Sequence, residues 1–487
     1  MTPARAVACL IAASAAIRLA FAAALGLGID ESYMVAAGRS VRLSYFDHPP
    51  LSWWLSAGIA HATGSEAAWV MRLPFIALFA VSTWLMFRLA ATLFGPRAGL
   101  LAAVALNLSP VFGVTTASWV LPDGPLDCAL LAAALCLARA LPARRAAWGW
   151  WLGAGLAAGG ALLSKYSAGL ILLGALGYLL TQPEHRRWLS RPQPYAAALV
   201  AAVALAPVLA WNAGHGWASF AFQGGRGAVE GLRPFGPLTV LGGEALFVLP
   251  WLWLPMMWAF LRALRAGPAA WESWLLCCLG ALPVLLFALV GLWSKHVLYH
   301  WAAPGYLMLF PLLGRQIERL SAARPRLVRA TLLGTAALLV VALGVVASEV
   351  HWNWLKLPAD PALQARDWTG LREGLAARGL LDRPGTVLAA TGWQEAGKIG
   401  YALGGDPVVL CLSRDAREFG LTVNAALVEG IDVLVLATRP VSRDGLAAQG
   451  FMFDSVEELP PLSVALAGRE PLTMLVFLAH RLHGPSV

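Results

Sequence analysis

The chain has 487 residues, of which 59% are hydrophobic and only 13% are charged. Soluble domains are about 25% charged and about 45–50% apolar, so this composition excludes a soluble globular enzyme over most of the length, and it also excludes disorder. The net charge of +9 comes largely from arginines clustered between long apolar runs. That distribution is typical of a multi-spanning membrane protein rather than of a nucleic-acid-binding one.

Eleven apolar runs are candidates for membrane-spanning helices, which need about 20 mostly apolar residues. The first run is kept as a span because it is long and lacks a clean signal-peptide cleavage site. The six cysteines include no CxxC pair, so we expect neither a disulfide framework nor a zinc site. The runs are Ala6–Leu27, Ala68–Leu93, Ala98–Val114, Leu126–Leu141, Trp148–Leu163, Ala168–Leu180, Tyr195–Trp211, Leu241–Leu261, Ser273–Leu292, Tyr299–Leu313 and Ala330–Ala347.

Basic residues are distributed unequally between alternate loops. One set of loops holds 14 of them and the other set holds six. Because basic residues are concentrated in cytoplasmic loops, the first set is predicted to be cytoplasmic, which places the N-terminus inside and everything after Ala347 outside. The first set comprises Arg97, Arg139, Arg144, Arg145, Arg186, Arg187, Arg191, Arg262, Arg265, Arg315, Arg319, Arg324, Arg326 and Arg329, and the second comprises Arg39, Arg42, Lys165, Arg226, Arg233 and Lys295.

The stretch from Glu349 to Val487 is more charged, and its apolar runs are shorter. Alternating strand-like and helix-like segments indicate a small α/β domain there. The predicted fold is therefore an all-α polytopic membrane protein over residues 1–348, with about 11 spans and a first outer loop at 28–67, followed by an extracytoplasmic α/β domain at 349–487. Strands are expected at Thr386–Ala390, Pro407–Leu412 and Ile431–Ala437, and helices at Pro361–Arg378 and Ala396–Leu403.

The first outer loop carries acidic residues at two points. Asp30 is suited to cap a helix that begins at Glu31, and Glu31–Leu43 has the spacing of an amphipathic helix on the membrane surface. Pro49-Pro50 is expected to start the next helix. Asp47, at that junction, is predicted to face the outer cavity, either as a general base or as a ligand that holds a divalent cation together with Asp30.

The predicted outer side collects ionisable side chains, which are costly at membrane depth and usually line a cavity or serve function. Any one of them alone is better explained as a helix cap at the interface, but the whole set on one face indicates an active or binding site. Asp123 lies in a Pro-Asp-Gly sequence, so it is either a turn residue or helix N-cap, or a cavity carboxylate. The set comprises Asp30, Glu31, Asp47, His48, Asp123, Lys165, His215, Arg226, Lys295, His296 and His300.

Three cationic residues come from three separate outer hairpins. Lys165 interrupts a short apolar turn, either snorkelling to the interface or binding phosphate as a point charge. Arg226 stands among aromatic residues, which are common at membrane interfaces and can also stack on a sugar. Together with Lys295, and with donors from Tyr299 and His300, these residues would suit a lipid phosphate or diphosphate if they converge.

Five motifs follow one another along the chain, namely Asp30-Glu31, Tyr45–Pro50, Pro122–Leu126, Leu163–Ser167 and Trp211–Trp217. Together they give the part of the chain from Asp30 to Leu313 a resemblance to one branch of the bacterial GT-C glycosyltransferases. Relatives of this branch include the protein O-mannosyltransferases and lipid A aminoarabinose transferase. The C-terminal part resembles the general plan of a trailing extracytoplasmic domain.

The resemblance implies an inverting glycosyltransferase that uses a polyprenyl-phosphate-linked sugar donor at the outer face of the bacterial inner membrane. Asp30 matches the acid usually assigned as catalytic, and Asp47 matches a second loop acid. Asp47-His48 stands where the aminoarabinose branch has Glu-Lys, so the neighbouring cation is weaker and depends on pH. The implied donor-phosphate contacts are Lys165, Arg226, Lys295 and His48, and the remaining predicted site residues are Glu31, Asp123, His215, Tyr299 and His300.

Several points stay open at this stage. The donor sugar is undetermined, the acceptor is lipid A, lipopolysaccharide, another lipid, a glycan or a protein, and a divalent cation is neither required nor excluded. Membrane lipids are expected partners, and nucleic acid is not. The alternatives are a polytopic transporter or flippase for lipid-linked sugars, which would need acidic or broken helices at the membrane midplane, and a structural protein with a vestigial site.

Overall fold

The computed structural model describes residues 1–144, 147–357, 364–405, 407–422, 429–466 and 470–483. They form two compact units. The helical unit comprises Met1–Ala20, Leu43–Ser52 and Arg72–Ala342, and the mixed unit comprises Phe21–Arg42, Trp53–Met71 and Leu343–Val487. Two parts of the first loop are therefore grouped with the C-terminal residues, while the domain limits proposed from the sequence, 1–348 and 349–487, stay a prediction.

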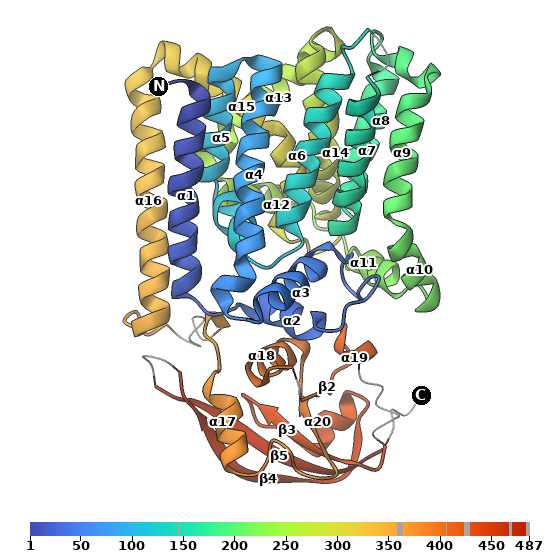
Figure 1. Ribbon diagram of the computed structural model, residues 1–487, viewed down its shortest axis with the longest axis vertical. Helices are drawn as coiled ribbons and strands as arrows, with labels where there is room; N and C mark the ends of the chain where they lie inside the picture. The colour runs from blue at the N-terminus through green and yellow to red at the C-terminus, as the bar shows by residue number, and fades with distance from the viewer. Residues whose placement is uncertain (145–146, 358–363, 406, 423–428, 467–469, 484–487) are drawn as a thin grey trace. The chain divides into compact units, whose positions relative to one another are not determined.

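Most of the helices of the chain up to residue 352 follow the apolar runs expected from the sequence (Figure 1). Helix α6 packs against α7, α7 against α9, α5 against α15, and α14 against both α8 and α15. The elements are α1 (Pro3–Ala24), α2 (Ile29–Gly38), α3 (Leu51–Thr63), α4 (Ala68–Phe94), α5 (Pro96–Leu108), η1 (Val111–Thr116), α6 (Asp123–Ala140), α7 (Trp148–Ser164), α8 (Ala168–Thr181), η2 (Arg186–Ser190), α9 (Pro192–Ala204), α10 (Ala206–Gly214), α11 (Ala218–Gly225), α12 (Gly236–Val248), α13 (Pro250–Ala266), η3 (Gly267–Ala269), α14 (Trp271–Val290), η4 (Tyr299–Ala302), α15 (Ala303–Ala323) and α16 (Pro325–Trp352).

Two of the expected spans are not straight helices. The run Tyr195–Trp211 bends by 42° between α9 and α10, and the run Leu241–Leu261 is divided between α12 and α13, which meet at 115°. Pro250 starts α13 directly after Leu249, whose φ of 85° cannot belong to a helix. The prediction of a single helix over Leu241–Leu261 is therefore wrong.

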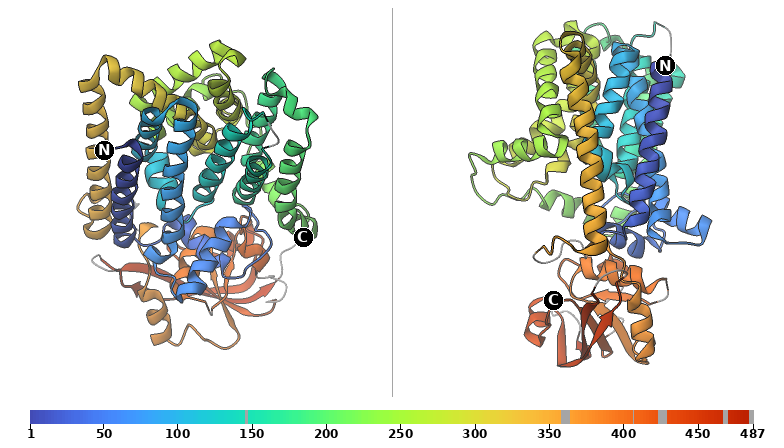
Figure 2. Two further views of the ribbon diagram at one scale, coloured as in Figure 1. Left: turned by 45° about the horizontal axis from the view of Figure 1, so that its top comes forward. Right: turned by 90° about the vertical axis from the view of Figure 1, so that its left-hand side faces the viewer.

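Within the described residues, four helices are long and apolar enough to cross a membrane, or up to six if each bent pair is one span. One of them is α16, which Figure 2 shows as a single unbroken helix. The chain is thus a multi-pass membrane protein, while the count of eleven spans stays a prediction.

The loops predicted to be cytoplasmic contact one another in the helical unit. Trp188 Nε1 donates a hydrogen bond to the carbonyl oxygen of Leu141 at 3.0 Å, and Gln182 Nε2 donates to that of Pro268 at 2.9 Å. Arg139 donates to Thr92 Oγ1 at 3.2 Å. These loops gather at one end of helices α4, α6, α8 and α14, as their alternation along the chain requires.

The C-terminal part contains a five-stranded sheet in the order β2-β1-β3-β5-β4. Strand β1 pairs in parallel with β2 and β3, and β5 pairs antiparallel with β3 and β4. The elements are α17 (Gly370–Ala377), β1 (Thr386–Ala390), α18 (Trp393–Leu403), β2 (Val409–Cys411), α19 (Phe419–Thr422), β3 (Asp432–Ala437), α20 (Arg443–Ala448), β4 (Met452–Val464) and β5 (Leu472–His483).

The three expected strands and the expected α18 are present, with ends that differ by a few residues. The helix predicted over Pro361–Arg378 is shorter, since α17 begins at Gly370, and residues 361–363 lie outside the described residues. Strands β4 and β5 were not predicted. Their antiparallel pairing has a register shift between Leu459 and Leu462, where Pro460-Pro461 masks the alternation of a strand.

The helix predicted on the membrane surface is instead a buried helix of the mixed unit. Helix α2 ends at Gly38 rather than Leu43, and seven of its ten residues are buried. It packs against α18. The ring of Tyr33 lies 5.4 Å from that of Trp53 and 5.3 Å from that of Trp393. Its apolar side chains therefore contribute to a protein core, which corrects the expectation of a membrane-surface helix.

Candidate functional site

A buried ion pair joins two separate loops of the helical unit. Lys165 Nζ lies 2.9 Å from Asp123 Oδ1, and the two side chains are only 13% and 11% exposed. Asp123 is the first residue of α6, and Lys165 follows α7 in an extended conformation. Since buried charges require partners, the pair resolves the two interpretations of Asp123: it is a partly buried carboxylate with a specific cationic partner, not only a turn residue.

Lys165 and Arg226 line one pocket, although 61 positions separate them in the sequence. The pocket has a volume of about 220 Å³. Its apolar wall comes from Leu170 of α8 and from Phe287 and Val290 of α14. The remaining lining residues are Tyr166, Ser167, Gln223, Gly224, Gly227 and Trp301. A pocket with two cations and an apolar wall fits an anionic head group attached to a hydrocarbon chain.

The guanidinium of Arg226 is held by aromatic rings. Its Cζ lies 4.7 Å from the centre of the Trp301 ring and 5.6 Å from that of Phe222. Such stacking fixes the plane of a guanidinium and suits arginine better than lysine. Arg226 directly follows α11, so this short helix and the turn η4 together determine where the charge lies.

The segment that carries Asp47 is attached to α11. Ser219 Oγ donates a hydrogen bond of 2.9 Å to the carbonyl oxygen of Tyr45, and Gln223 Nε2 donates to the carbonyl oxygen of Asp47. Asp47 is 3% exposed and interacts electrostatically with Tyr166, a pocket residue. Because Gln223 also lines the pocket, the predicted base and the two cations belong to one region of the helical unit.

Two histidines named from the sequence also belong to this region. His300 interacts electrostatically with Lys165, Asp123 and Arg226, and His48 interacts with Asp123. Both lie in non-helical or 3-10 segments beside the pocket residues. The structure therefore brings together Asp47, His48, Asp123, Lys165, Arg226 and His300 of the predicted set.

Three other predicted residues make contacts outside the pocket. Lys295 is 65% exposed, and its Nζ lies 3.7 Å from Glu230. The ring of His215 stacks on Trp211 with centres 4.1 Å apart, and the ring of Tyr299 lies 5.8 Å from that of Phe247. None of these three lines the pocket, so their predicted roles gain no support from the geometry.

Glu230 was not predicted, and it occupies the exposed loop that follows Arg226. The backbone N–H of Lys295 donates to its Oε2 at 3.0 Å, and His296 Nε2 lies 2.8 Å from its Oε1. These contacts lower the pKa of Glu230 from its ordinary value of 4.5, the backbone hydrogen bond contributing most.

Asp30 and Glu31 lie in the first turn of α2, in the mixed unit. Asp30 is exposed, whereas Glu31 is 3% exposed. Glu31 Oε2 accepts a hydrogen bond of 2.8 Å from the backbone N–H of Gly28, the residue that precedes the helix. Glu31 therefore supplies the cap that we expected from Asp30, which is already inside the helix.

Asp127 is an acid that the sequence analysis missed. It follows Asp123 by one helical turn on α6, it is 3% exposed, and the two carboxylates interact electrostatically. The sequence does contain a signal for it: Asp123 and Asp127 are two acids four residues apart in an otherwise apolar stretch, which places them on one face of a helix.

No group of three or more His, Cys, Asp or Glu side chains lies close enough to hold a metal ion within the described part of the chain. Asp30 and Asp47 belong to different compact units. The divalent cation considered from the sequence therefore stays a prediction.

The sequence of the chain matches one known protein family over part of its length. Residues 47–211 match the family model described as dolichyl-phosphate-mannose-protein mannosyltransferase. This segment includes Asp47, Asp123 and Lys165. Compared with curated protein sequences, the chain gives no match.

Among solved structures, the chain is similar to ArnT from Cupriavidus metallidurans. With the form bound to undecaprenyl phosphate the identity is 16% and the TM-score 0.63, and 97% of each chain is covered. With the apo form the identity is 15% and the TM-score 0.60, at the same coverage. The chain therefore has the fold of ArnT, and over residues 47–211 it matches a family of mannosyltransferases. This confirms the fold class predicted from the sequence, and both matches agree with the resemblance found there. The chain carries its pocket between α8, α11 and α14.

Proposed function

We propose that the chain is a GT-C glycosyltransferase, which transfers a sugar, with inversion, from a polyprenyl-phosphate-linked donor at the outer face of the bacterial inner membrane. The acceptor group is a hydroxyl or phosphate of lipid A, lipopolysaccharide, another lipid, a glycan or a protein. The observation that carries the proposal is the pocket in which Lys165 and Arg226 meet an apolar wall. The binding of undecaprenyl phosphate by ArnT, which shares the fold, supports it.

The two cations are suited to stabilise the leaving phosphate. In the ground state Lys165 is balanced by Asp123 at 2.9 Å. A lipid phosphate in the pocket competes with Asp123 for the ammonium, while Arg226 adds donors in a plane fixed by Trp301 and Phe222. As the bond between the anomeric carbon and the phosphate oxygen breaks, the electron pair stays on the phosphate, and both cations stabilise that charge.

A carboxylate of the first loop supplies the base. The acceptor hydroxyl transfers its proton to Asp47 or Asp30 as its oxygen attacks the anomeric carbon from the face opposite to the phosphate. One base is sufficient for inversion, because the leaving phosphate needs little help from an acid. Asp47 is favoured by its connection to the pocket through Gln223, whereas Asp30 lies on α2 of the mixed unit.

The test is sugar transfer by the purified full chain in liposomes that contain a polyprenyl-phosphate sugar. Mass spectrometry of envelope lipids from cells with and without the chain identifies the sugar and the acceptor to use. Asp47→Asn is expected to reduce the rate about 100-fold to 10,000-fold, the usual contribution of a general base. Asp444→Asn, an exposed residue of α20, is the matched control.

Unchanged transfer in both Asp47→Asn and Asp30→Asn would remove the catalytic assignment. Movement of the lipid across the bilayer without any transfer to an acceptor would instead support the transporter alternative. The orientation is tested by cysteines introduced at Gly231 and Arg186, which follow α11 and α8 respectively. A membrane-impermeant thiol reagent applied from the periplasm should label position 231 and not position 186.

A further inference from the structure

The turn that follows Lys165 carries two hydroxyl groups that the fold leaves unsatisfied. Tyr166 and Ser167 line the pocket, and the oxygen atoms of their hydroxyl groups are buried. Within the part of the chain that the structure describes, neither oxygen has a hydrogen-bond partner. Nearly all buried polar groups in proteins form hydrogen bonds, because an unmade bond costs free energy. Both hydroxyl groups therefore require an explanation.

Ser167 is not used to cap the helix that it precedes. It occupies the N-cap position of α8, where a serine side chain usually accepts a hydrogen bond from the helix, but it makes no such bond. The first three backbone N–H groups of α8 donate instead to the carbonyl oxygens of residues 165–167, at 3.1 Å each. The helix therefore does not need the hydroxyl group of Ser167.

The hydroxyl group of Tyr166 lies near the segment that carries the proposed base. The ring of Tyr166 is packed against that of Phe220 on α11, with centres 5.0 Å apart. The hydroxyl group interacts electrostatically with Asp47 and lies close to the side chain of Ser44. Ser44 is completely buried, and its Oγ is a third oxygen that has no hydrogen-bond partner among the described residues. Three unsatisfied hydroxyl groups thus belong to the region of Lys165 and Asp47.

Two further polar side chains near Tyr166 are anchored to backbone atoms. Asn212 Nδ2 donates to the carbonyl oxygen of Val208 at 3.0 Å, and its Oδ1 accepts a hydrogen bond of 3.2 Å from the backbone N–H of Ser219. Ser219 Oγ donates to the carbonyl oxygen of Tyr45. Burial raises the pKa of Tyr166 above its ordinary value of 10.0, so its hydroxyl group keeps its proton at neutral pH and can donate a hydrogen bond.

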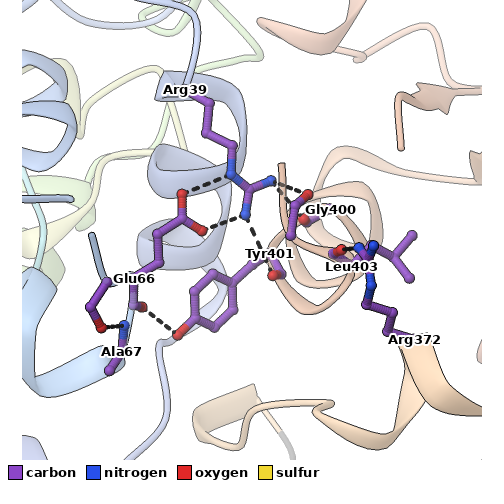
Figure 3. A network of polar contacts seen from close by, with 9 residues as sticks. Arg39, Glu66, Ala67, Arg372, Gly400, Tyr401 and Leu403 are labelled. Carbon is purple, nitrogen blue, oxygen red and sulfur yellow. Dashed lines mark hydrogen bonds and ion pairs between the residues drawn. The ribbon is translucent and has the colours of Figure 1, made fainter. Parts of the chain in front are cut away.

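Tyr401 of α18 shows how a tyrosine that supports the fold uses its hydroxyl group (Figure 3). Its Oη donates a hydrogen bond of 2.9 Å to the carbonyl oxygen of Glu66. The carboxylate of Glu66 in turn accepts two hydrogen bonds from Arg39, at 2.9 and 2.6 Å. Tyr401 and Tyr166 are both half-buried, but only Tyr401 is part of such a network. This contrast indicates that the hydroxyl group of Tyr166 serves a ligand and not the fold.

The proposed reaction places the donor sugar beside Tyr166. In an inverting transfer the anomeric carbon lies between the leaving group and the attacking oxygen, which approach it from opposite faces. The phosphate is assigned to Lys165 and Arg226, and the base is assigned to Asp47. Tyr166 directly follows Lys165 and interacts with Asp47, so it connects the two ends of this line. A sugar carries several hydroxyl groups, which donate and accept hydrogen bonds and so complement unsatisfied serine and tyrosine side chains.

We infer that Ser44, Tyr166 and Ser167 form the subsite for the sugar ring of the donor, in which Tyr166 Oη donates a hydrogen bond to a sugar oxygen. The inference rests on the proposed function. It extends that function because it gives the sugar its own binding residues, separate from the two cations that bind the phosphate. All three residues belong to the helical unit, as do Lys165, Arg226 and Asp47.

The first test is the binding of lipids with and without a sugar to the purified full chain. The probes are undecaprenyl phosphate alone and undecaprenyl phosphate linked to mannose, glucose, N-acetylglucosamine or aminoarabinose. The wild type should distinguish among the four sugars. For the sugar that it binds most tightly, Tyr166→Phe, which removes the hydroxyl group and keeps the ring, should bind about threefold to tenfold more weakly, the usual contribution of one neutral hydrogen bond.

Two comparisons separate the sugar from the phosphate. Tyr166→Phe should bind undecaprenyl phosphate alone as the wild type does, because this lipid has no sugar. Tyr401→Phe is the matched control, since it also removes one tyrosine hydroxyl group, and it should bind every probe as the wild type does. Ser167→Ala and Ser44→Ala should each weaken binding of the sugar-linked lipid in the same direction as Tyr166→Phe.

Thermal unfolding without lipid gives a readout that a role in the fold would move in the opposite direction. Removal of a buried hydroxyl group that has no partner should leave the thermal midpoint of Tyr166→Phe unchanged or raise it. Tyr401→Phe should have a lower midpoint, because it loses the bond to Glu66. If Tyr166→Phe does not fold, the hydroxyl group supports the fold and the inference is wrong.

Three other results would overturn the inference. They are equal binding of all four sugar-linked lipids by the wild type, equal weakening of undecaprenyl phosphate and its sugar-linked form in Tyr166→Phe, and a loss of stability in Tyr166→Phe as large as that in Tyr401→Phe. Failure of the proposed function looks different. The wild type would then transfer no sugar, while its preference for one sugar-linked lipid and the effect of Tyr166→Phe on that preference would persist.

Discussion

The molecule contains two partly or fully buried lysines whose surroundings differ in kind. Lys165 is paired with one carboxylate, Asp123, and lines a pocket with Arg226. Lys398 donates hydrogen bonds to three backbone carbonyl oxygens and lies beside an indole ring. A carboxylate partner can be exchanged for a phosphate, whereas backbone carbonyls are fixed by the fold. The comparison therefore separates a cation suited to act on a substrate from one that holds structure.

The largest effect is expected from Lys165→Met. Removal of a cation that stabilises the leaving phosphate should reduce kcat/KM about 100-fold to 1,000-fold, the usual cost of losing one such group. Lys398→Met should leave donor affinity unchanged. Steady-state transfer rates with a polyprenyl-phosphate sugar measure both. Equal losses of donor affinity in the two variants would contradict the claim that Lys165 contacts the donor and Lys398 does not.

Asp123→Asn tests the ion pair of Lys165 by changing the carboxylate that lies beside it. Breaking a buried pair leaves an uncompensated charge and typically costs about 3–5 kcal/mol, so the thermal midpoint should fall. Undecaprenyl phosphate should then stabilise the variant more than the wild type, because the phosphate replaces the lost carboxylate. Thermal unfolding in detergent with and without the lipid measures this difference. A smaller stabilisation of the variant than of the wild type would contradict exchange of partners at Lys165.

Arg226→Lys tests whether the plane of the guanidinium matters. Lysine keeps the charge but cannot stack as a plane between Trp301 and Phe222, so donor affinity should fall about 10-fold, which corresponds to loss of one good cation–π or bidentate contact. Binding of undecaprenyl phosphate is the measurement, with Arg233→Lys, in the same loop, as the control. Equal affinities in the two lysine variants would show that only charge is needed.

The smallest effect is expected at Glu230, where the ion pair is exposed. The pKa of Glu230 is lowered in the folded chain, so its ionised form stabilises the fold above the ordinary value of 4.5, and this contribution is lost as pH falls through the lower folded value. Glu230→Gln should therefore be slightly less stable than the wild type at pH 7, and the difference should vanish at acid pH. A difference that grows on acidification would contradict the assignment.

The sequence predicted the arrangement of the helical unit better than its local breaks. Alternation of basic loops anticipated which loops meet, as the contacts of Trp188 with Leu141 show. The break between α12 and α13 was missed, because hydropathy is continuous across Leu249 and Pro250 and does not record backbone direction. Helix α2 was misplaced on the membrane because an apolar face has the same pattern whether it meets lipid or α18.

The candidate site was predictable as a set of residue types and not as a geometry. Lys165 and Arg226 were chosen as cations on one side, and the pocket brings them together. Lys295 fitted the same argument equally well but pairs with Glu230 in an exposed loop. Side-chain partners across separate hairpins depend on how the helices pack, which no spacing within one segment reveals.

The most direct test of the central claim, that Lys165 and Arg226 hold the phosphate of the donor, is the binding of undecaprenyl phosphate to four forms of the purified chain. These are the wild type, Lys165→Met, Arg226→Met and Lys295→Met. We predict that Lys165→Met and Arg226→Met each bind at least about 10-fold more weakly, and that Lys295→Met binds as the wild type does. Wild-type affinity in Lys165→Met and Arg226→Met, or a loss confined to Lys295→Met, would contradict the assignment of the phosphate to this pocket.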